Sequence, residues 1–298
     1  MPAESSAASE IERALSTFAT VRPRLFGIAY RMLGSASEAQ DIVQEVWIRW
    51  QTYDRSTVRD PAAFLATTTT RLAINAVTSA RVRRETYIGP WLPEPVDTSA
   101  DPLLGAERGE ALEFAVLLIL EKLSPTERAA YVLREAFDYP YSQIAEVIQQ
   151  TEASSRQLVS RARKHLAEER RASVSASEQQ RLLDAFVGAA QSGNLAALEE
   201  LLAEDVVSYS DGGGVVRASR IPVLGRDHVS KYITAFASRF WEGVSVAPVL
   251  ANGQASVRLS RDGIDFAVVS ITASAEGIDQ VLWMMNPGKL GRMTAPIA

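Results

Sequence analysis

The chain of 298 residues contains no cysteine and only two histidines, His165 and His228, which lie far apart in sequence. The lack of cysteine excludes disulfides, thiolate metal sites and cysteine nucleophiles, and it is typical of proteins from a reducing compartment. Two distant histidines do not make a metal site either. We therefore expect neither a bound metal ion nor a cofactor.

Long apolar runs are also missing. No segment approaches the roughly 20 apolar residues that a membrane span needs, and the first nine residues are small and acidic, unlike an export signal. These features predict a soluble cytoplasmic protein that does not contact a membrane. The net charge of -5 excludes a surface coated in positive charge, so any contact with nucleic acid must come from local basic patches.

The chain is long enough for two or three domains, since 47% of its residues are hydrophobic. Helical patterns fill residues 10–86 and 109–171. Between them, residues 87–108 are rich in proline, which removes N–H donors and restricts the preceding residue, so this segment predicts a linker. Two helices and then short strands predict an α+β domain at 177–298, with a sheet curled round its helices. The expected strands are the Val- and Ile-rich runs 206–209, 215–218, 221–224, 244–250, 255–259, 264–272 and 278–285.

Residues 139–166 predict a helix-turn-helix, with the turn at 149–151 and Thr151 as the cap of the second helix. Ser155, Val159, Ala162 and Leu166 form one narrow stripe on that helix, which is expected to be buried. A basic face on such a helix is often only a solvated surface. Here the exposed faces carry groups that bond phosphates or base edges, namely Arg156, Gln157, Ser160, Arg161, Arg163 and Lys164.

The helix at 37–50 is more apolar than a single core face requires. Ile42 and Val46 cannot share one stripe with Val43, Trp47 and Trp50, so the helix predicts a core face and a second face for a partner protein. The alternative is that both tryptophans simply belong to the core. A further helix begins at Pro61 and ends in a basic tail.

Four stretches, in this order, resemble the two conserved domains of an extracytoplasmic-function (ECF) sigma factor of the sigma-70 family: DIVQEVWIRW, a helix ending RVRRE, LSPTERAAYVLREAFDYPYSQIAEVI and SSRQLVSRARKHL. WLPEP in the linker, DGGG at 211–214 and NPGKL at 286–290 resemble one group within this family. That group, the SigJ-like proteins, carries a SnoaL-like C-terminal domain of the nuclear-transport-factor-two-like fold. The resemblance spans residues 10–290.

The resemblance implies a non-enzymatic subunit of bacterial RNA polymerase that directs promoter-specific transcription initiation. Sigma region 2 would occupy 10–86, the linker 87–108, sigma region 4 109–171 and the SnoaL-like regulatory domain 177–298. Region 2 would bind the clamp helices of the largest polymerase subunit through Asp41, Gln44, Glu45 and Trp47. It would also contact promoter DNA at the minus-ten element through Arg71, Arg81, Arg83 and Arg84. The helix-turn-helix of region 4 would read the minus-thirty-five element, with Arg156, Gln157 and Arg161 nearest the bases.

In the resembling group the C-terminal domain regulates the sigma factor in cis by touching the linker. The implied contacts on the linker are Trp91, Leu92 and Pro93, and those on the C-terminal domain are Asp211, Gly212, Gly213, Asn286, Pro287, Lys289 and Leu290. Such folds enclose an apolar pocket that can hold a small-molecule ligand, and some use an Asp or His as acid or base, for which Asp211, Asp227 and His228 are available here. We expect no catalysis here, because Gly212–Gly214 predict a turn with unusual dihedral angles that Asp211 can cap.

Two alternatives remain at the level of the sequence. One is a ligand-responsive helix-turn-helix regulator, and the other is a polyketide cyclase or isomerase fused to a DNA-binding module, which needs an acid or base in its pocket. The helix at 37–50 favours the sigma factor, because a repressor needs no polymerase-binding surface.

Overall fold

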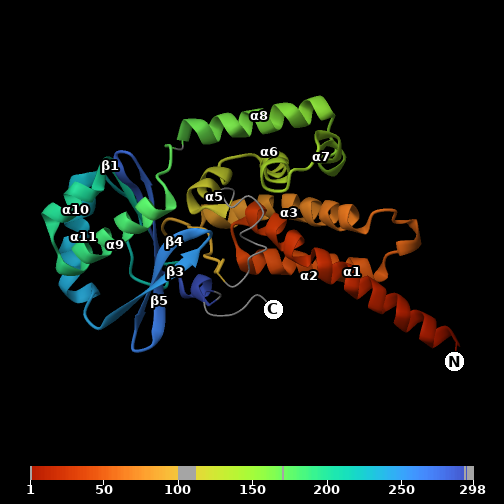
Figure 1. Cartoon of the computed structure of the whole chain (residues 1–298), viewed down its shortest axis with the longest axis horizontal. Helices are drawn as coiled ribbons and strands as arrows, with labels where there is room; N and C mark the ends of the chain where they lie inside the picture. The colour runs from red at the N-terminus through yellow and green to blue at the C-terminus, as the bar shows by residue number, and fades with distance from the viewer. Residues whose placement is uncertain (1, 100–111, 170, 292, 294–298) are drawn as a thin grey trace. The chain divides into compact units, whose positions relative to one another are not determined.

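The computed structural model describes residues 2–99, 112–169, 171–291 and 293 (Figure 1). Within these ranges no helix is long and apolar enough to cross a membrane.

The chain divides into two compact units. The first, called the helical unit, comprises Met1–Val82, Leu103–Leu112 and Ile119–Leu166. The second, called the C-terminal unit, comprises Arg83–Pro102, Glu113–Leu118 and Ala167–Ala298. Residues 87–99 of the linker therefore belong to the compact body of the C-terminal domain, whereas most of the two helical regions shares one body. The rest of the predicted linker, 100–108, lies outside the described residues.

Local signals set the helix boundaries in the helical unit. Gly34, with a φ of 63°, follows α1, and the Ser35 side chain caps α2 by accepting a hydrogen bond from the backbone N–H of Glu38 at 3.2 Å. The helices before residue 170 are α1 (Pro2–Leu33), α2 (Ala36–Thr52), η1 (Arg55–Thr57), α3 (Pro61–Glu85), α5 (Phe114–Leu120), α6 (Pro125–Tyr131), the π-helical turn η3 (Val132–Ala136), α7 (Tyr141–Ile148) and α8 (Glu152–Glu169). Most of α5 lies in the C-terminal unit.

The predicted helix-turn-helix is confirmed as α7 and α8. Gln149 turns the chain in the left-handed region with a φ of 55°, and the Thr151 hydroxyl accepts from the backbone N–H of Ser154 at 3.1 Å. All four residues of the predicted stripe are buried. The polar residues of α8 are consequently left on its outer faces.

The C-terminal unit is an α+β domain, as the sequence predicted in outline (Figure 1). Its one six-stranded sheet has the order β2-β1-β6-β5-β4-β3. Only β1 and β6 pair in parallel among the described strands. Its elements are α9 (Ala176–Ser192), α10 (Leu195–Leu201), β1 (Leu202–Asp211), β2 (Val223–Leu224), α11 (Arg226–Phe240), β3 (Val244–Ala251), β4 (Gln254–Arg261), β5 (Ile264–Ser274), β6 (Gly277–Met284) and α12 (Pro287–Leu290).

One predicted strand is wrong. The run 215–218 is not a strand, because Gly213 and Gly214 take φ values of 62° and 74° and fold the chain back, so that the Val216 N–H donates to the Gly212 carbonyl at 3.0 Å. Valine content alone cannot outweigh a turn imposed by the preceding glycines.

The two faces of β6 pack against different partners. Val281 and Trp283 join the large core under α9, α10 and α11. Leu282 and Met284 belong to a second cluster that contains Leu92 of the linker. Because successive residues of a strand point to opposite faces, β6 separates the domain core from the surface on which the linker lies.

Candidate functional site

The outer face of α2 carries the residues that the resemblance assigns to the polymerase. Asp41 and Gln44 are exposed, Glu45 is half-buried and pairs with Arg49 at 2.8 Å, and Trp47 is half-buried. Ile48, which the sequence did not single out, is also exposed on α2. This helix therefore presents a mixed polar and apolar surface.

The two tryptophans of α2 differ in their surroundings. Trp50 is buried and donates its indole N–H to the Ala14 carbonyl at 3.2 Å, so it belongs to the core. The Trp47 ring lies 4.9 Å from that of Phe18 but stays partly open to solvent. The core alternative thus holds for Trp50, while Trp47 remains available to a partner.

Two arginines of α3 that were expected to contact DNA phosphates donate to backbone carbonyls within the helical unit. Arg71 donates to the carbonyls of Glu146 at 2.8 Å and Val147 at 3.0 Å. These carbonyls lie in the last turn of α7, where a helix leaves its acceptors without intrahelical donors. Arg81 donates to the carbonyls that precede α6, those of Glu121 at 3.0 Å and Leu123 at 2.9 Å.

The other two arginines of that set lie in the C-terminal unit. Arg83 is exposed, whereas Arg84 stacks on the linker, with its guanidinium carbon 3.6 Å from the centre of the Trp91 ring. A DNA-contact role for these four arginines stays a prediction.

The polar face of α8, which the sequence predicts to read DNA, is exposed along its whole length. Three of its arginines pair with carboxylates of the same unit: Arg156 with Glu152, Arg161 with Glu127 at 3.7 Å and Arg163 with Glu135 at 2.7 Å. The Glu135 carboxylate raises the pKa of Arg163. Gln157, Ser160 and Lys164 lie exposed beside them. Exposed pairs of this kind are weak, so a phosphate can compete for these guanidinium groups.

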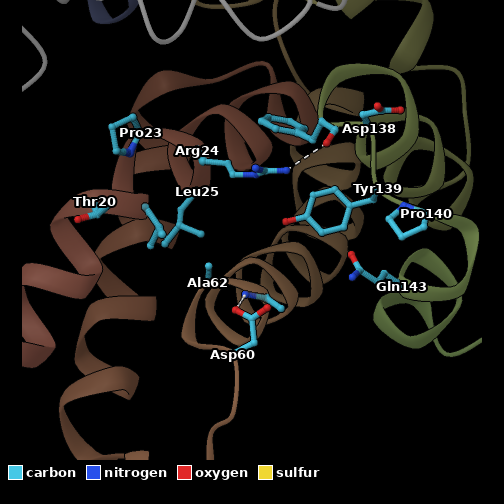
Figure 2. A pocket seen from close by; sticks show the side chains of 13 residues that line it. Thr20, Pro23, Arg24, Leu25, Asp60, Ala62, Asp138, Tyr139, Pro140 and Gln143 are labelled. Carbon is cyan, nitrogen blue, oxygen red and sulfur yellow. Dashed lines mark hydrogen bonds between the residues drawn. The ribbon is translucent and has the colours of Figure 1, made fainter.

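Arg24 of α1 and the segment between η3 and α7 both line a cavity of about 440 Å³ (Figure 2). It donates to the Phe137 carbonyl at 3.1 Å, and its guanidinium lies over the rings of Phe137 and Tyr139. The first helix of region 2 and the segment that enters the helix-turn-helix are thereby joined directly.

A buried arginine forms a second join inside the helical unit. Arg128 of α6 is 1% exposed, donates from Nε to the Arg31 carbonyl of α1 at 3.1 Å and pairs with the Glu121 carboxylate. Burial, and then the positive charge of Arg81, lower the pKa of Arg128. A guanidinium held in this environment depends on its carboxylate partner.

In the C-terminal unit the linker lies along the edge of the sheet. Its Val96 exchanges two hydrogen bonds of 2.9 Å with Asn252, one to the side-chain oxygen and one from the backbone N–H. The Thr98 N–H donates to the Leu250 carbonyl at 3.0 Å, and Asp97 pairs with Ala251 as an isolated bridge. The proline-rich segment thus covers the exposed end of β3.

The Asp211 carboxylate at the end of β1 is the centre of the linker contact. It is 0% exposed and accepts from four donors. The linker supplies the Tyr87 hydroxyl at 2.5 Å and the Leu92 N–H at 2.9 Å. The C-terminal domain supplies the Gly213 N–H at 3.1 Å and the Lys289 ammonium at 2.6 Å. We call Asp211, Lys289, Asn286, Tyr87 and Leu92 the linker clasp.

Lys289 and Asn286 close the clasp from the NPGKL segment. Lys289 donates also to the Leu92 carbonyl at 2.5 Å, and its ammonium lies 4.4 Å from the Trp91 ring. Asn286 donates to the Tyr87 hydroxyl at 2.8 Å and accepts from the Gly288 N–H at 3.0 Å. Pro287 begins α12, while Pro93, Leu92 and Leu290 are buried, the last two in one cluster.

The glycines of the DGGG stretch are needed for close approach. A Cβ on Gly213 would lie 2.3 Å from the Asn286 side chain, and one on Gly212 would lie 2.4 Å from the Val216 carbonyl oxygen. Both positions therefore exclude any side chain.

Burial and charge shift the pKa values of two residues in the clasp, Tyr87 and Lys289. Burial, together with the hydrogen bond to and the charge of Asp211, raises the pKa of Tyr87. Burial lowers the pKa of Lys289, although Asp211 acts in the opposite direction. The phenol is thus held as a neutral donor to the carboxylate.

Tyr87→Phe is expected to lower the free energy of unfolding of the C-terminal unit by about 1.5 kcal/mol near neutral pH, because a hydrogen bond to a charged acceptor is lost. A group whose folded pKa is raised contributes fully below its ordinary pKa, here 10.0, and loses that contribution as the pH rises above it. Urea unfolding at pH 7, 9 and 10.5 should show the wild type losing more stability than the variant between the last two values. Tyr232→Phe is the matched control, since the Tyr232 hydroxyl has no hydrogen bond within the described part of the chain. Parallel pH profiles for wild type and Tyr87→Phe would contradict the expectation.

The acids and bases considered for catalysis do not meet in a cavity. Asp211 is engaged in the clasp, and Asp227 pairs with Lys231 on the exposed surface of α11 beside His228. The cavity of the C-terminal unit has no Asp, Glu or His among the residues described as lining it. The fused cyclase or isomerase is therefore not supported.

Sequence reasoning missed two members of these contacts. Neither Tyr87 nor Asn252 is among the residues that the resemblance assigns to this contact. A tyrosine four residues before Trp91 in a proline-rich segment was the available signal. Nothing in the sequence indicated that Asn252 would pair with Val96.

Comparisons with known proteins identify the two helical regions. Residues 17–83 match the family model described as Sigma-70 region 2, and residues 113–166 match the one described as Sigma-70, region 4.

Curated relatives extend the match into the C-terminal domain. The ECF RNA polymerase sigma factor SigJ of Mycobacterium tuberculosis is 37% identical over 80% of this chain and 79% of its own length. The probable ECF RNA polymerase sigma factor SigI of the same organism is 31% identical over 93% of this chain and 94% of its own. The crystal structure of the M. tuberculosis ECF sigma factor SigJ aligns with a TM-score of 0.75 at 32% identity, covering 93% of this chain and 98% of that one.

Proposed function

This chain belongs to the extracytoplasmic-function sigma factors of the sigma-70 family, and we propose that it directs bacterial RNA polymerase to its promoters under the control of its own C-terminal domain. It is a non-enzymatic transcription initiation factor. The alternative of a free-standing ligand-responsive repressor is not favoured, because region 2 and its outward-facing α2 have no role in such a protein.

The linker clasp is the observation that carries the regulatory part of the proposal. A fully buried carboxylate with four donors fixes Tyr87, just before WLPEP, and Leu92, within it, to the C-terminal domain. Val96 and Thr98, which follow WLPEP, bond to the edge of the sheet. Residues 87–99 are thereby withdrawn from the connection between α3 and α6. Because linker length sets how far two tethered modules can separate, the clasp controls the spacing of regions 2 and 4.

The contacts inside the helical unit support a resting state that is closed to DNA. Arg71 and Arg81 donate hydrogen bonds to carbonyls of region 4. Arg24 and Arg128 form hydrogen bonds that join α1 to region 4. A backbone carbonyl offers an arginine the same kind of acceptor as a phosphate oxygen. Region 2 must therefore separate from region 4 before α3 can use these arginines on promoter DNA.

The roles of α2 and α8 complete the proposal. Asp41, Gln44, Glu45 and Trp47 would bind the clamp helices of the polymerase, and the exposed face of α8 would read the minus-thirty-five element. An acidic protein needs little affinity of its own for DNA when the polymerase holds it close to the promoter.

Reconstituted transcription tests both parts. Core polymerase with the full chain is expected to initiate at promoters that core polymerase alone does not use, and the absence of added initiation would overturn the sigma assignment. Trp91→Ala removes the ring between Arg84 and Lys289, which weakens the clasp, and is expected to raise initiation several-fold. Ile264→Ala, a change at an exposed position of the same unit outside the linker contact, is the control. Unchanged initiation and unchanged solution dimensions for Trp91→Ala would overturn the regulation while leaving the sigma assignment intact.

A further inference from the structure

A cavity of about 690 Å³ opens between α11 and the sheet of the C-terminal unit. Its volume falls within the range of roughly 300–1,000 Å³ that small-molecule sites occupy. Side chains from α11, from strands β1, β4, β5 and β6, and from the segment after the DGGG turn line it. The aromatic members of the lining are Tyr232, Phe236, Phe240, Trp241, Phe266 and Trp283.

The aromatic side chains form a fixed wall. The Phe240 ring meets those of Trp241, Phe266 and Trp283 edge to face, with centroid separations of 5.1, 5.7 and 5.6 Å. This geometry orients each ring through its neighbours, so the cavity offers preformed flat and edge surfaces. A planar aromatic body matches such a wall better than a flexible chain, which would lose more conformational freedom on binding.

The charged residues described as lining the cavity are all positive. Arg217, Arg239 and Arg261 line it, and no acidic residue is among the described lining residues. Arg261 is held in place by donating to the carbonyls of Phe240 at 2.7 Å and Glu242 at 3.1 Å. Arg217 and Arg239 are exposed and make no hydrogen bond or ion pair within the ranges that the structure describes. Two guanidinium groups are thus available to an anion.

The indole N–H of Trp283 is a further polar group in the cavity. Trp283 is 7% exposed and lines the cavity, yet its indole N–H has no acceptor among the described residues. A buried donor without a partner is unfavourable, and an oxygen on a ligand would satisfy it.

We infer that this cavity binds a planar aromatic carboxylate that carries a second oxygen acceptor on its ring system. The carboxylate lies at Arg217 and Arg239, the rings lie against the Phe240 wall, and the ring oxygen accepts from the Trp283 N–H.

Binding here acts on the linker through two strands. Ser210 and Trp283 line the cavity, while the next residues along their strands, Asp211 and Met284, face the linker. A ligand that fixes these strand ends therefore changes the clasp on the opposite face. This consequence for regulation rests on the proposed function, but the binding itself does not.

Isothermal titration of the full chain tests the binding with three matched probes. These are 9-fluorenone-2-carboxylate, fluorene-2-carboxylate, which lacks the ring oxygen, and 9-fluorenone-2-carboxamide, which lacks the charge. The fluorenone carboxylate is expected to bind about fivefold more tightly than either of the others, since each loses one polar interaction.

Two variants assign the polar contacts. Trp283→Phe keeps the ring wall and should abolish the difference between the fluorenone and fluorene carboxylates. Arg239→Gln, at an exposed position, should reduce the difference between carboxylate and carboxamide. Lys231→Gln, on the same helix but outside the cavity lining, should change neither. No heat of binding with the fluorenone carboxylate, equal affinity for all three probes, or differences that both variants leave intact would each overturn the inference. If the fluorenone carboxylate binds as expected but does not affect transcription by the full chain, only the proposed function is overturned.

Discussion

Replacing Asp211 by asparagine is expected to lower the free energy of unfolding of the C-terminal unit by about 3–5 kcal/mol, the range found when one partner of a buried ion pair is removed. Asp211 is fully buried, and each of the four groups that contact its carboxylate donates a hydrogen bond. In asparagine an NH2 donor replaces one of the two carboxylate oxygens, so this donor faces the donors that the carboxylate had accepted from. It also leaves the Lys289 ammonium, whose side chain is 12% exposed, without its counter-charge.

Urea unfolding of the full chain, followed by the fluorescence of its tryptophans, measures this loss. Asp227→Asn is the matched control, because Asp227 pairs with Lys231 at positions where both side chains are 61% exposed, and a change of less than about 0.5 kcal/mol is expected there. The double variant Asp211→Asn with Lys289→Met should recover part of the loss, because it removes the stranded charge. A loss below about 1 kcal/mol for Asp211→Asn would show that the clasp does not hold the linker.

The helix-turn-helix could be predicted in detail because its signals are local. The cap at Thr151, the turn at Gln149 and each step of the stripe from Ser155 to Leu166 depend on residues only a few positions apart. Burial of this stripe fixes which side chains face outward. The candidate DNA-reading face of α8 therefore follows from the sequence alone.

The atoms of the clasp could not be predicted in this way. The motif resemblance indicated that WLPEP, DGGG and NPGKL belong together, but the Tyr87 to Asp211 and Asn286 to Tyr87 contacts join residues 124 and 199 positions apart. They depend on the parallel register of β1 and β6, which pairs Asp211 with Met284 and so brings Asn286 beside the carboxylate. No periodicity in the sequence encodes that register.

The arginines of α3 show a different limit. The resemblance implies DNA contacts for them, and in this structure the donors of Arg71 and Arg81 satisfy carbonyls of region 4 instead. Sequence specifies that a guanidinium needs acceptors, but which acceptors it meets depends on the tertiary state. For Arg84 the partner is the Trp91 ring, so one side chain can serve the linker in one state and be offered to DNA in another.

Glu121→Gln is expected to destabilise the helical unit by about 3 kcal/mol, because it leaves the Arg128 guanidinium buried without a counter-charge. Arg128 also donates to the Arg31 carbonyl, so its displacement loosens α6 from α1. Hydrogen exchange of the amides in α6 reports this loosening, and protection there should fall by about a hundredfold.

A double-mutant cycle separates the ion pair from simple packing. Arg128→Met removes the buried charge together with its need for a partner, so Glu121→Gln should have little further effect in that background, and the two changes should be non-additive by about 2 kcal/mol. Arg134→Met with Glu135→Gln is a control in which neither change removes a fully buried charge, and its effects should add. If the closed helical unit is the resting state, the loosening of α6 also weakens the contact of Arg81 with the backbone carbonyls of Glu121 and Leu123 that precede this helix, and initiation by the full chain should rise as stability falls. Additive effects at Glu121 and Arg128, or a fall in initiation parallel to the fall in stability, would show that this buried pair serves folding alone and does not restrain the separation of regions 2 and 4.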